Sequence, residues 1–549
     1  MNRKIIGLLS LFIIILTMSV VCAEENQTSA NLTSSNIVVS GDSFDDVQNT
    51  IKGASSSDVI ELEGYYHGNR KPINIDKSVT IQGSKNGATL DAKKLSNVFV
   101  IKANNVTLKD LTIKNSYGSA ILNEYNSKKF DVTVINCSFI NNNERDDGGA
   151  IFHANNGALT VINSTFENNG ADYGGAVYVS SGNLKIINSN FTNNVATYCG
   201  GAIYAPCDSM SISGCQFNAN RASKGSEGGA ISSLCNNALI SDSSFQNNRA
   251  DNGGAINCWG NLTVKNSSFT SNVANEKAGA IFASSDLDDN GNFDSRLSIT
   301  DSNFTSNTAA NVSGIYTKLC AVDISNSQFG DNQEVYIKLG TLKNVNNTLK
   351  NVKIDNTLKM IILPDKYSTT YDSLECLRVT TLDDERYYIS NVKIKVVVTV
   401  GKKTKTFYGY TDLDEYEAYI PLYQLPVGKY SIKVSVDGNQ FKSGTVKKTI
   451  TIKKADTIVK APKLTAKYKK SKKFTIKVKN KSTHYNVKNL KIKVKVYTGK
   501  KVKKFIVKTN KKGVATINTK KLKRGSHKVV ITSKNKNYDV YKKSKIVIK

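Results

Sequence analysis

A phenylalanine recurs along the middle of this 549-residue chain at intervals of about 25 residues, and an asparagine follows each one three positions later. The eight pairs are Phe139 and Asn142, Phe166 and Asn169, Phe191 and Asn194, Phe217 and Asn220, Phe245 and Asn248, Phe269 and Asn272, Phe304 and Asn307, and Phe329 and Asn332. Successive phenylalanines lie 24 to 28 residues apart, with one interval of 35. Such a constant spacing indicates one structural unit repeated along an axis.

Two further columns share this period. Gly-Gly-Ala followed by Ile or Val occurs at Gly148–Ile151, Gly174–Val177, Gly200–Ile203, Gly228–Ile231 and Gly253–Ile256. Short alternating runs such as Leu159–Ile162 and Leu184–Ile187 form the other column. A period of about 25 residues supplies three strands with their turns, which is one coil of a β-helix. We therefore predict an all-β fold with a right-handed parallel β-helix over residues 36–355.

Each column has an expected scaffold role in the stacked coils. The phenylalanines should form a buried ladder, and the asparagines should sit at turns that tolerate left-handed backbone and pair between coils. The two glycines permit a tight corner. Residues Phe44–Ile51, with acidic residues in their first turn, favour a short helix that covers the open N-terminal end.

The N-terminus is typical of an export signal. Arg3 and Lys4 precede an apolar run, and Val21-Cys22-Ala23 offers a cleavage site. We predict a signal peptide over residues 1–23, a polar linker over 24–35, and a secreted protein at the cell surface or wall. An uncleaved signal is the alternative, and it would be the chain's contact with a membrane.

Two stretches near the C-terminus resemble each other. Asn391–Val396 corresponds to Asn489–Val494 at an offset of 98 residues, and both stretches continue with Gly-Lys-Lys. Their long alternating strands predict two Ig-like β-sandwiches, over residues 365–454 and 456–549.

The positive charge is concentrated in the second of these domains. The chain has a net charge of +30, and residues 456–549 contain 32 Lys and Arg against two acidic residues. Lysine alternates with apolar residues over Lys491–Val496, which predicts one apolar face and one face covered by lysines. The alternative is a merely solvated face. We expect the tail to bind a cell-wall polymer or another anionic glycan, and export argues against a nucleic acid.

The pairing of Phe-x-x-Asn with Gly-Gly-Ala-Ile resembles the repeat of chlamydial-type polymorphic outer-membrane proteins. Together with the signal and the lysine-rich tail, the chain resembles the adhesin-like surface proteins of methanogenic archaea. This resemblance implies a non-catalytic adhesin-like protein that contacts glycans or the surfaces of other cells. A polysaccharide lyase or hydrolase built on the β-helix, and a purely structural surface-layer component, are the alternatives.

The coil of 35 residues contains a candidate calcium loop. Its oxygen-bearing residues are spaced like the first nine positions of a calcium-binding loop, with Gly291 at the sixth. They are Asp286, Asp288, Asn290, Asn292 and Asp294. The twelfth position is Leu297 where a bidentate glutamate is expected, so a plain acidic loop is the alternative.

Two cysteines occupy equivalent positions in neighbouring coils. Cys207 and Cys235 each follow the alanine of a Gly-Gly-Ala motif by five residues. In-register neighbours would lie about 4.8 Å apart, which is within disulfide range. Two buried free thiols are the alternative.

Catalytic signals are weak in this sequence. Asp146 and Asp147 with His153 are the one grouping that suits acid–base chemistry, and they lie at a corner that is equally suited to plain solvation. We predict no catalytic residues.

Overall fold

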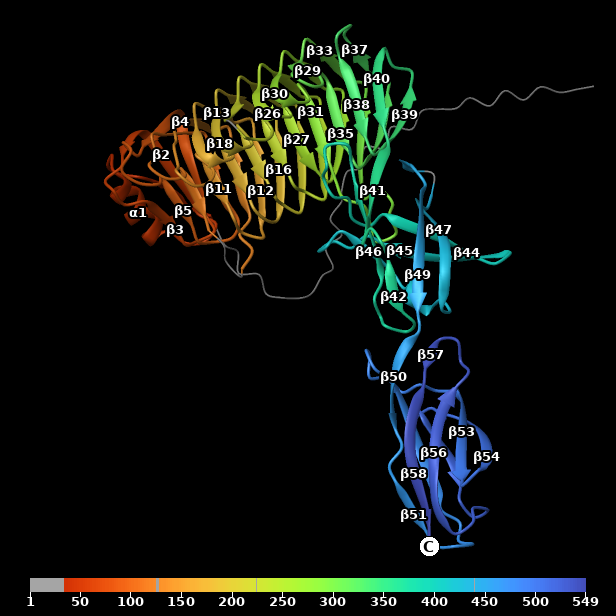
Figure 1. The fold of residues 1–549 in the computed structure, drawn as a ribbon. Coiled ribbons are helices and arrows are strands. Elements are labelled where there is room, and N and C mark those ends of the chain that lie inside the picture. The colour runs from red at the N-terminus through yellow and green to blue at the C-terminus, as the bar shows by residue number, and fades with distance from the viewer. Residues whose placement is uncertain (1–33, 125–127, 224, 439) are drawn as a thin grey trace, which may run out of the picture.

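The computed structural model describes residues 34–549 apart from 125–127, 224 and 439. The predicted signal peptide and residues 24–33 of the predicted linker lie outside the described residues. A long β-helix runs from β1 (Asn36–Val38) to β40 (Asn351–Asp355), and two β-sandwiches follow it (Figure 1). The predicted N-terminal helix is present as α1 (Phe44–Gly53), which begins with a capping box between Ser43 and Asp46.

Regular coils contain four short strands rather than the three predicted. One coil consists of β15 (Val177–Val179), β16 (Asn183–Ile187), β17 (Asn190–Thr192) and β18 (Val195–Cys199). The additional strand arises because the segment between the ladder asparagine and the Gly-Gly corner pairs with its copy in the next coil, which satisfies its backbone groups. The named strands of successive coils pair in parallel, as Leu184 does with Met210, with register shifts after Leu62, Ala171 and Ala250. The predicted right-handed parallel β-helix is thus confirmed.

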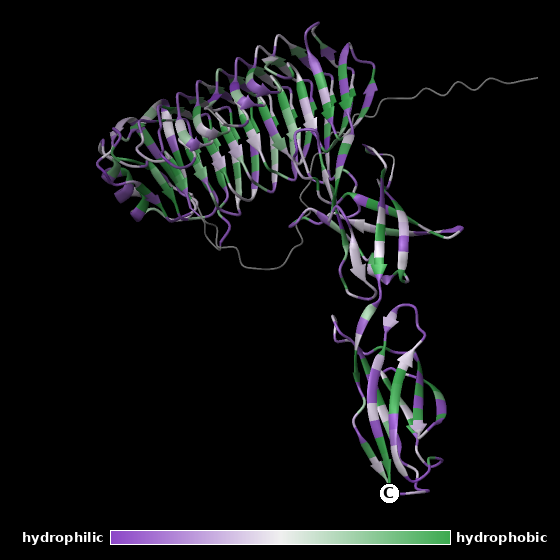
Figure 2. Ribbon diagram, viewed as in Figure 1, coloured by the Kyte–Doolittle hydropathy of each residue, from purple (hydrophilic) through white to green (hydrophobic). Residues whose placement is uncertain are grey.

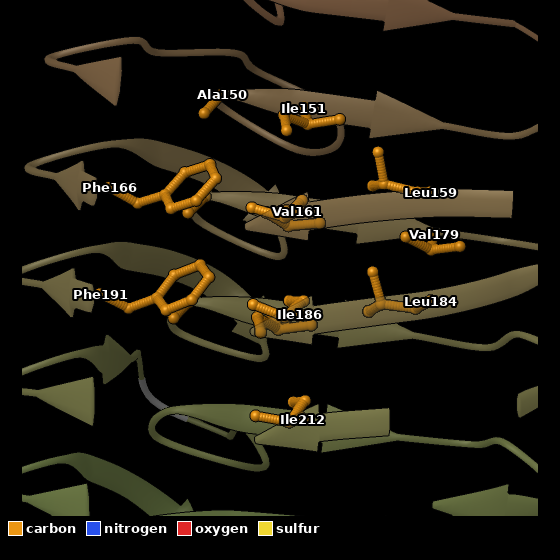
Figure 3. Close-up of a cluster of buried hydrophobic side chains, with 14 of the residues drawn as sticks. Ala150, Ile151, Leu159, Val161, Phe166, Val179, Leu184, Ile186, Phe191 and Ile212 are labelled. Carbon is orange, nitrogen blue, oxygen red and sulfur yellow. The ribbon is translucent and has the colours of Figure 1, made fainter. Parts of the chain in front are cut away.

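All eight predicted phenylalanines stack in one column inside the helix. Neighbouring ring centroids lie 4.6–4.8 Å apart, and neighbouring ring planes are within 6° of parallel. Figure 3 shows Phe166 and Phe191 in this ladder beside Val161 and Ile186 of the adjoining strand column. The ladder confirms the predicted role of the phenylalanines.

The asparagines form a second internal ladder. The backbone N–H of Asn194 and its Nδ2 both donate to Oδ1 of Asn220, at 3.1 and 2.9 Å, and this pattern continues from Asn142 to Asn307. The prediction of left-handed backbone at these residues was wrong, because the residue before each one adopts it instead, as at Asn193. Asn332 was also wrongly assigned: it is exposed, and Gln333 accepts the bond from Asn307 at 2.9 Å.

A third ladder lies two residues before each phenylalanine and was not predicted. The backbone N–H of each member donates to the side-chain oxygen or sulfur of the next, as from Ser164 to Ser189 at 3.1 Å. Its members are Cys137, Ser164, Ser189, Cys215, Ser243, Ser267, Ser302 and Ser327. Serine is so common in this chain that its recurrence two residues before each phenylalanine is not a distinctive sequence pattern.

The two sandwiches have the same topology. Each packs a four-stranded sheet on a five-stranded sheet, in the orders β46-β43-β41-β48 and β42-β49-β47-β44-β45, then β55-β52-β50-β57 and β51-β58-β56-β53-β54. Figure 2 shows hydrophobic and hydrophilic residues alternating along their strands. The first sandwich begins at residue 357, not at the predicted 365, because β41 already pairs with β43.

The strands of the first sandwich are β41 (Thr357–Leu363), β42 (Ser368–Thr370), β43 (Leu377–Leu382), β44 (Lys393–Val400), β45 (Lys403–Tyr410), β46 (Glu417–Ile420), β47 (Gly428–Val436), β48 (Lys442–Ser443) and β49 (Val446–Lys453). Those of the second are β50 (Ala455–Lys460), β51 (Leu464–Ala466), β52 (Lys473–Asn480), β53 (Lys491–Thr498), β54 (Lys501–Lys508), β55 (Val514–Asn518), β56 (Gly525–Ser533), β57 (Tyr538–Asp539) and β58 (Tyr541–Ile548).

The β-helix and the first sandwich share a packed junction, which we call the elbow. Lys338 is buried there, and its Nζ lies 2.7 Å from Asp384, 2.9 Å from Glu385 and 3.5 Å from Asp383. Lys318 adds a second cation 2.9 Å from Asp383, whose side chain is fully buried. Buried ion pairs of this kind hold two domains in one relative orientation only while both partners are present.

Candidate binding surfaces

The outer side of the five-stranded sheet in the second sandwich is covered by lysines. Along β53, Lys491, Lys493 and Lys495 alternate with buried Ile492 and Val494. The strand registers place lysines of β54, β56 and β58 on the same side. We define the lysine face as Lys491, Lys493, Lys495, Lys504, Lys508, Lys528, Lys543 and Lys545.

In the described part of the chain, none of these lysines forms an ion pair with a carboxylate. Among the described residues, the ion pair found in the second sandwich joins Lys481 to Asp456, away from this face. The charge of Lys495 lowers the pKa of Lys493, and burial, Lys504 and Lys534 lower it further. Exposed Ile506 lies among the lysines, with 76% of its surface accessible. The face therefore combines unpaired positive charge with apolar surface.

The first sandwich provides an internal comparison. Its equivalent lysines, Lys393 and Lys395, are bridged by Asp437 at 3.3 and 3.4 Å. The strand registers place Lys534 of the second sandwich where the first has Asp437. The same fold thus carries an aspartate that bridges two lysines in one domain and a further lysine at that position in the other.

A second surface lies at one corner of the β-helix and was not predicted. Five aromatic rings form a chain there with centroid separations of 5.1–5.5 Å. We define the aromatic corner as Phe152 of β11 (Ile151–His153), Tyr173 of β14 (Gly170–Tyr173), Tyr178 of β15, Tyr198 of β18 and Tyr204 of β19 (Ile203–Ala205).

Carboxylates surround these rings. Burial, together with the nearby charges of Asp146, Asp172 and Glu144, raises the pKa of Asp147 to about 6. Burial also raises the pKa of Tyr173, Tyr178 and Tyr204, with the charge of Asp147 contributing at each. Asp147 forms a parallel β-bridge with Tyr173 of the next coil, which places its carboxylate at the corner.

His153 does not join this group. Its side chain is buried inside the helix, where Nε2 lies 3.2 Å from the carbonyl oxygen of Gly157 and Nδ1 lies 3.0 Å from Nδ2 of Asn123. Burial lowers its pKa. The grouping of Asp146, Asp147 and His153 considered from the sequence is not assembled, because His153 points to the opposite side of the strand from the corner.

The candidate calcium loop lies at the elbow. Buried Leu287 packs in the core of the first sandwich, Phe293 contacts Phe441 edge-on, and Asn391 donates to the carbonyl oxygen of Leu287 at 2.8 Å. Asp288 accepts the backbone N–H groups of Asn290 and Asn292 at 2.9 and 2.7 Å. Among the described residues, no three His, Cys, Asp or Glu side chains are grouped as a metal site.

Cys207 and Cys235 lie in adjacent coils with their sulfur atoms 2.8 Å apart, and both are buried. We predict that they form a disulfide after export under oxidising conditions. Alkylation of the unfolded, unreduced protein followed by peptide mass mapping should leave this pair unmodified and label buried Cys258. Full labelling of Cys207 and Cys235 would show two free thiols instead.

Comparison with protein-family models gave a match within the β-helix. Three of its segments match a family model. They are residues 163–180, 188–206 and 242–258, and the model is the Chlamydia polymorphic membrane protein repeat. These segments contain several of the Phe-x-x-Asn and Gly-Gly-Ala motifs, and they make up less than half of the chain. A search of curated proteins gave no significant match.

Several solved structures show limited similarity. Invasin, described as a bacterial integrin-binding protein, is 11% identical over 35% of this chain and 39% of its own, with a TM-score of 0.24. The adhesin InvE of Yersinia pseudotuberculosis is 14% identical over 35% of this chain and 58% of its own, with a TM-score of 0.20. The Escherichia coli adhesin FdeC is 15% identical over 36% of this chain and 65% of its own, with a TM-score of 0.18. The chain thus spans less than two thirds of each of these proteins. Within its described part, no helix is both long and apolar enough to cross a membrane.

Proposed function

We propose that this chain is a non-catalytic, adhesin-like protein of a cell surface or wall. The β-helix serves as a stalk or binding face, and the lysine face attaches to an anionic wall polymer. The observation that carries the attachment is the set of eight lysines on one sheet that form no ion pair with the residues the structure describes. The match to a membrane-protein repeat supports a surface location.

Attachment by this face depends on its charge density. A lysine close to an anionic surface contributes about 1 kcal/mol, and salt screens that contribution over about 8 Å at physiological ionic strength. Several lysines held side by side on a sheet act together on one polymer chain. Their binding should therefore be strong at low salt and weak at high salt.

Four substitutions to glutamine on the lysine face, at Lys491, Lys495, Lys504 and Lys543, should weaken binding to polygalacturonate at least about 100-fold, given about 1 kcal/mol per lysine. The matched control neutralises Lys460, Lys473, Lys477 and Lys479, which lie on the other sheet of the same sandwich. Binding can be measured by calorimetry, with methyl-esterified polymer as the neutral probe. Equal losses in the two variants would mean that net charge, not this face, determines attachment.

The non-catalytic part of the proposal rests on the aromatic corner. A lyase or hydrolase needs an acid and a base that face the same substrate. Asp147 faces outward at the corner, whereas His153 is enclosed in the core.

We also propose calcium as a ligand of the loop from Asp286 to Asp294. A bound cation would neutralise the carboxylates beside the elbow and stiffen the packing of Leu287 against the first sandwich. Calorimetry should give binding heat for the wild type and none for the Asp286→Ala, Asp288→Ala double variant. Asp289→Ala, outside the ligand spacing, is the control. Equal heat from all three proteins at millimolar calcium would mean that this loop is acidic but is not a calcium site.

A further inference from the structure

The aromatic corner is confined to three consecutive coils. Phe152, Tyr178 and Tyr204 occupy equivalent outward positions on paired strands. The next two positions in that column are Ser232 and Asn257, and aromatic residues return nearer the elbow at Phe282, Tyr316 and Tyr336. Tyr198 of the flanking column is 48% exposed. Ser232 and Asn257 thus separate this patch from the aromatic residues near the elbow. What distinguishes the patch is its carboxylates, because the acids near Tyr316, Asp384 and Glu385, pair with lysines.

The carboxylates around this patch lack cationic partners among the described residues. Among the described residues, no ion pair involves Asp146, Asp147 or Asp172, although Lys or Arg pairs with acidic residues elsewhere on the helix, as Arg296 does with Asp323. Residues 36–355 contain 30 acidic and 25 basic residues, a net charge of −5. A partly buried carboxylate beside aromatic rings is stabilised when a cation arrives, because the cation pairs with the carboxylate and with the ring faces.

The complementary surface is present on the same chain. The lysine face presents ammonium groups that form no ion pair with any described residue, together with apolar side chains such as Ile506 that can cover tyrosine rings. Within one copy the two surfaces are separated by the later coils of the helix, the elbow and the first sandwich (Figure 1). A contact between them therefore requires two molecules.

We propose that the aromatic corner of one copy binds the lysine face of a second copy, head to tail. Because the two surfaces differ, each contact leaves one surface free on each of the two copies, so further copies can add head to tail unless the rotation between copies closes a ring. Copies would join into open chains along a surface. This inference uses the lysine face but does not depend on attachment to a wall polymer.

The first test is sedimentation velocity of the full chain at about 50 mM and about 500 mM salt, since screening separates the two regimes. The wild type should form larger species with rising concentration at low salt and should be monomeric at high salt. Neutralising the corner by Asp146→Asn, Asp147→Asn and Asp172→Asn should weaken association at least about tenfold. The control neutralises three exposed acids elsewhere on the helix, Glu167, Asp208 and Asp242. A wild type that stays monomeric at both salt concentrations, or a corner variant that associates like the control, would overturn the proposal.

The decisive test mixes two variants. The corner variant keeps its lysine face, and the four-glutamine variant keeps its corner, so neither should self-associate but the mixture should form a one-to-one complex. The corner variant should still bind polygalacturonate as the wild type does, which separates this proposal from wall attachment. Absence of the mixed complex would overturn head-to-tail docking.

Discussion

Replacing Gly201 by alanine should destabilise the β-helix by about 3 kcal/mol or more, at the upper end of overpacking costs. A Cβ at this position would lie 2.0 Å from the carbonyl oxygen of Gly229 in the next coil and 2.6 Å from backbone atoms of Arg221. These are backbone atoms held by the stacked hydrogen bonds, so they cannot move aside as a flexible side chain could.

The measurement is thermal unfolding followed by far-ultraviolet circular dichroism, with the helix transition shifted to lower temperature by several degrees. Gly53→Ala is the matched control within the same domain, because a Cβ at Gly53 meets no atom within 4 Å. Identical transitions for the two variants would contradict the steric role of the second glycine in the Gly-Gly motif.

Replacing Lys338 by methionine should weaken the elbow by about 3–5 kcal/mol, because removing one partner leaves buried charge uncompensated. Asp383 would keep Lys318 but lose the second of its two cations, and Asp384 would lose the cation that lies 2.7 Å away. Glu385 would keep Lys277 at 2.9 Å. We expect the β-helix and the first sandwich to unfold in separate transitions, and the linking residues 355–357 to become sensitive to protease.

The control is Lys350→Met, since Lys350 pairs with Asp331 where both side chains are mostly exposed. Exposed pairs contribute about 0–1 kcal/mol, so that variant should behave like the wild type. Adding Asp383→Asn to Lys338→Met should recover part of the loss, because it removes a buried negative charge. If Lys338→Met unfolds like the control, the elbow is not held by this cluster.

The sequence revealed the β-helix because stacked coils place equivalent residues in one environment. Phe166 and Phe191 meet the same neighbours, so the same residue type recurs and the period is visible. The third ladder, which runs from Cys137 to Ser327, was not predicted because serine also occurs at many surface turns of this chain. Asn332 was misplaced because the last coil shifts by one residue, so that Gln333 enters the ladder.

The candidate surfaces also differ in whether the sequence predicts them. Alternation of lysine with isoleucine and valine along β53 predicted the lysine face, because a strand places alternate residues on opposite sides. The aromatic corner lies in a column that is interrupted by Ser232 and Asn257 and mixes phenylalanine with tyrosine, so it does not repeat one residue type as the phenylalanine ladder does. The elbow joins Lys338 to Asp383 through tertiary packing, and in the sequence Asp383–Glu385 looks like an ordinary exposed turn.

The central claim is that the lysine face holds this protein on an anionic surface, and retention on purified cell-wall material across an ionic-strength series tests it most directly. Three proteins are compared: the full chain, the four-glutamine variant and a variant ending at Lys454. The full chain should be retained strongly at low salt and released as the salt rises, whereas the other two should be retained weakly throughout. Equal retention of all three proteins, unaffected by salt, would contradict the account.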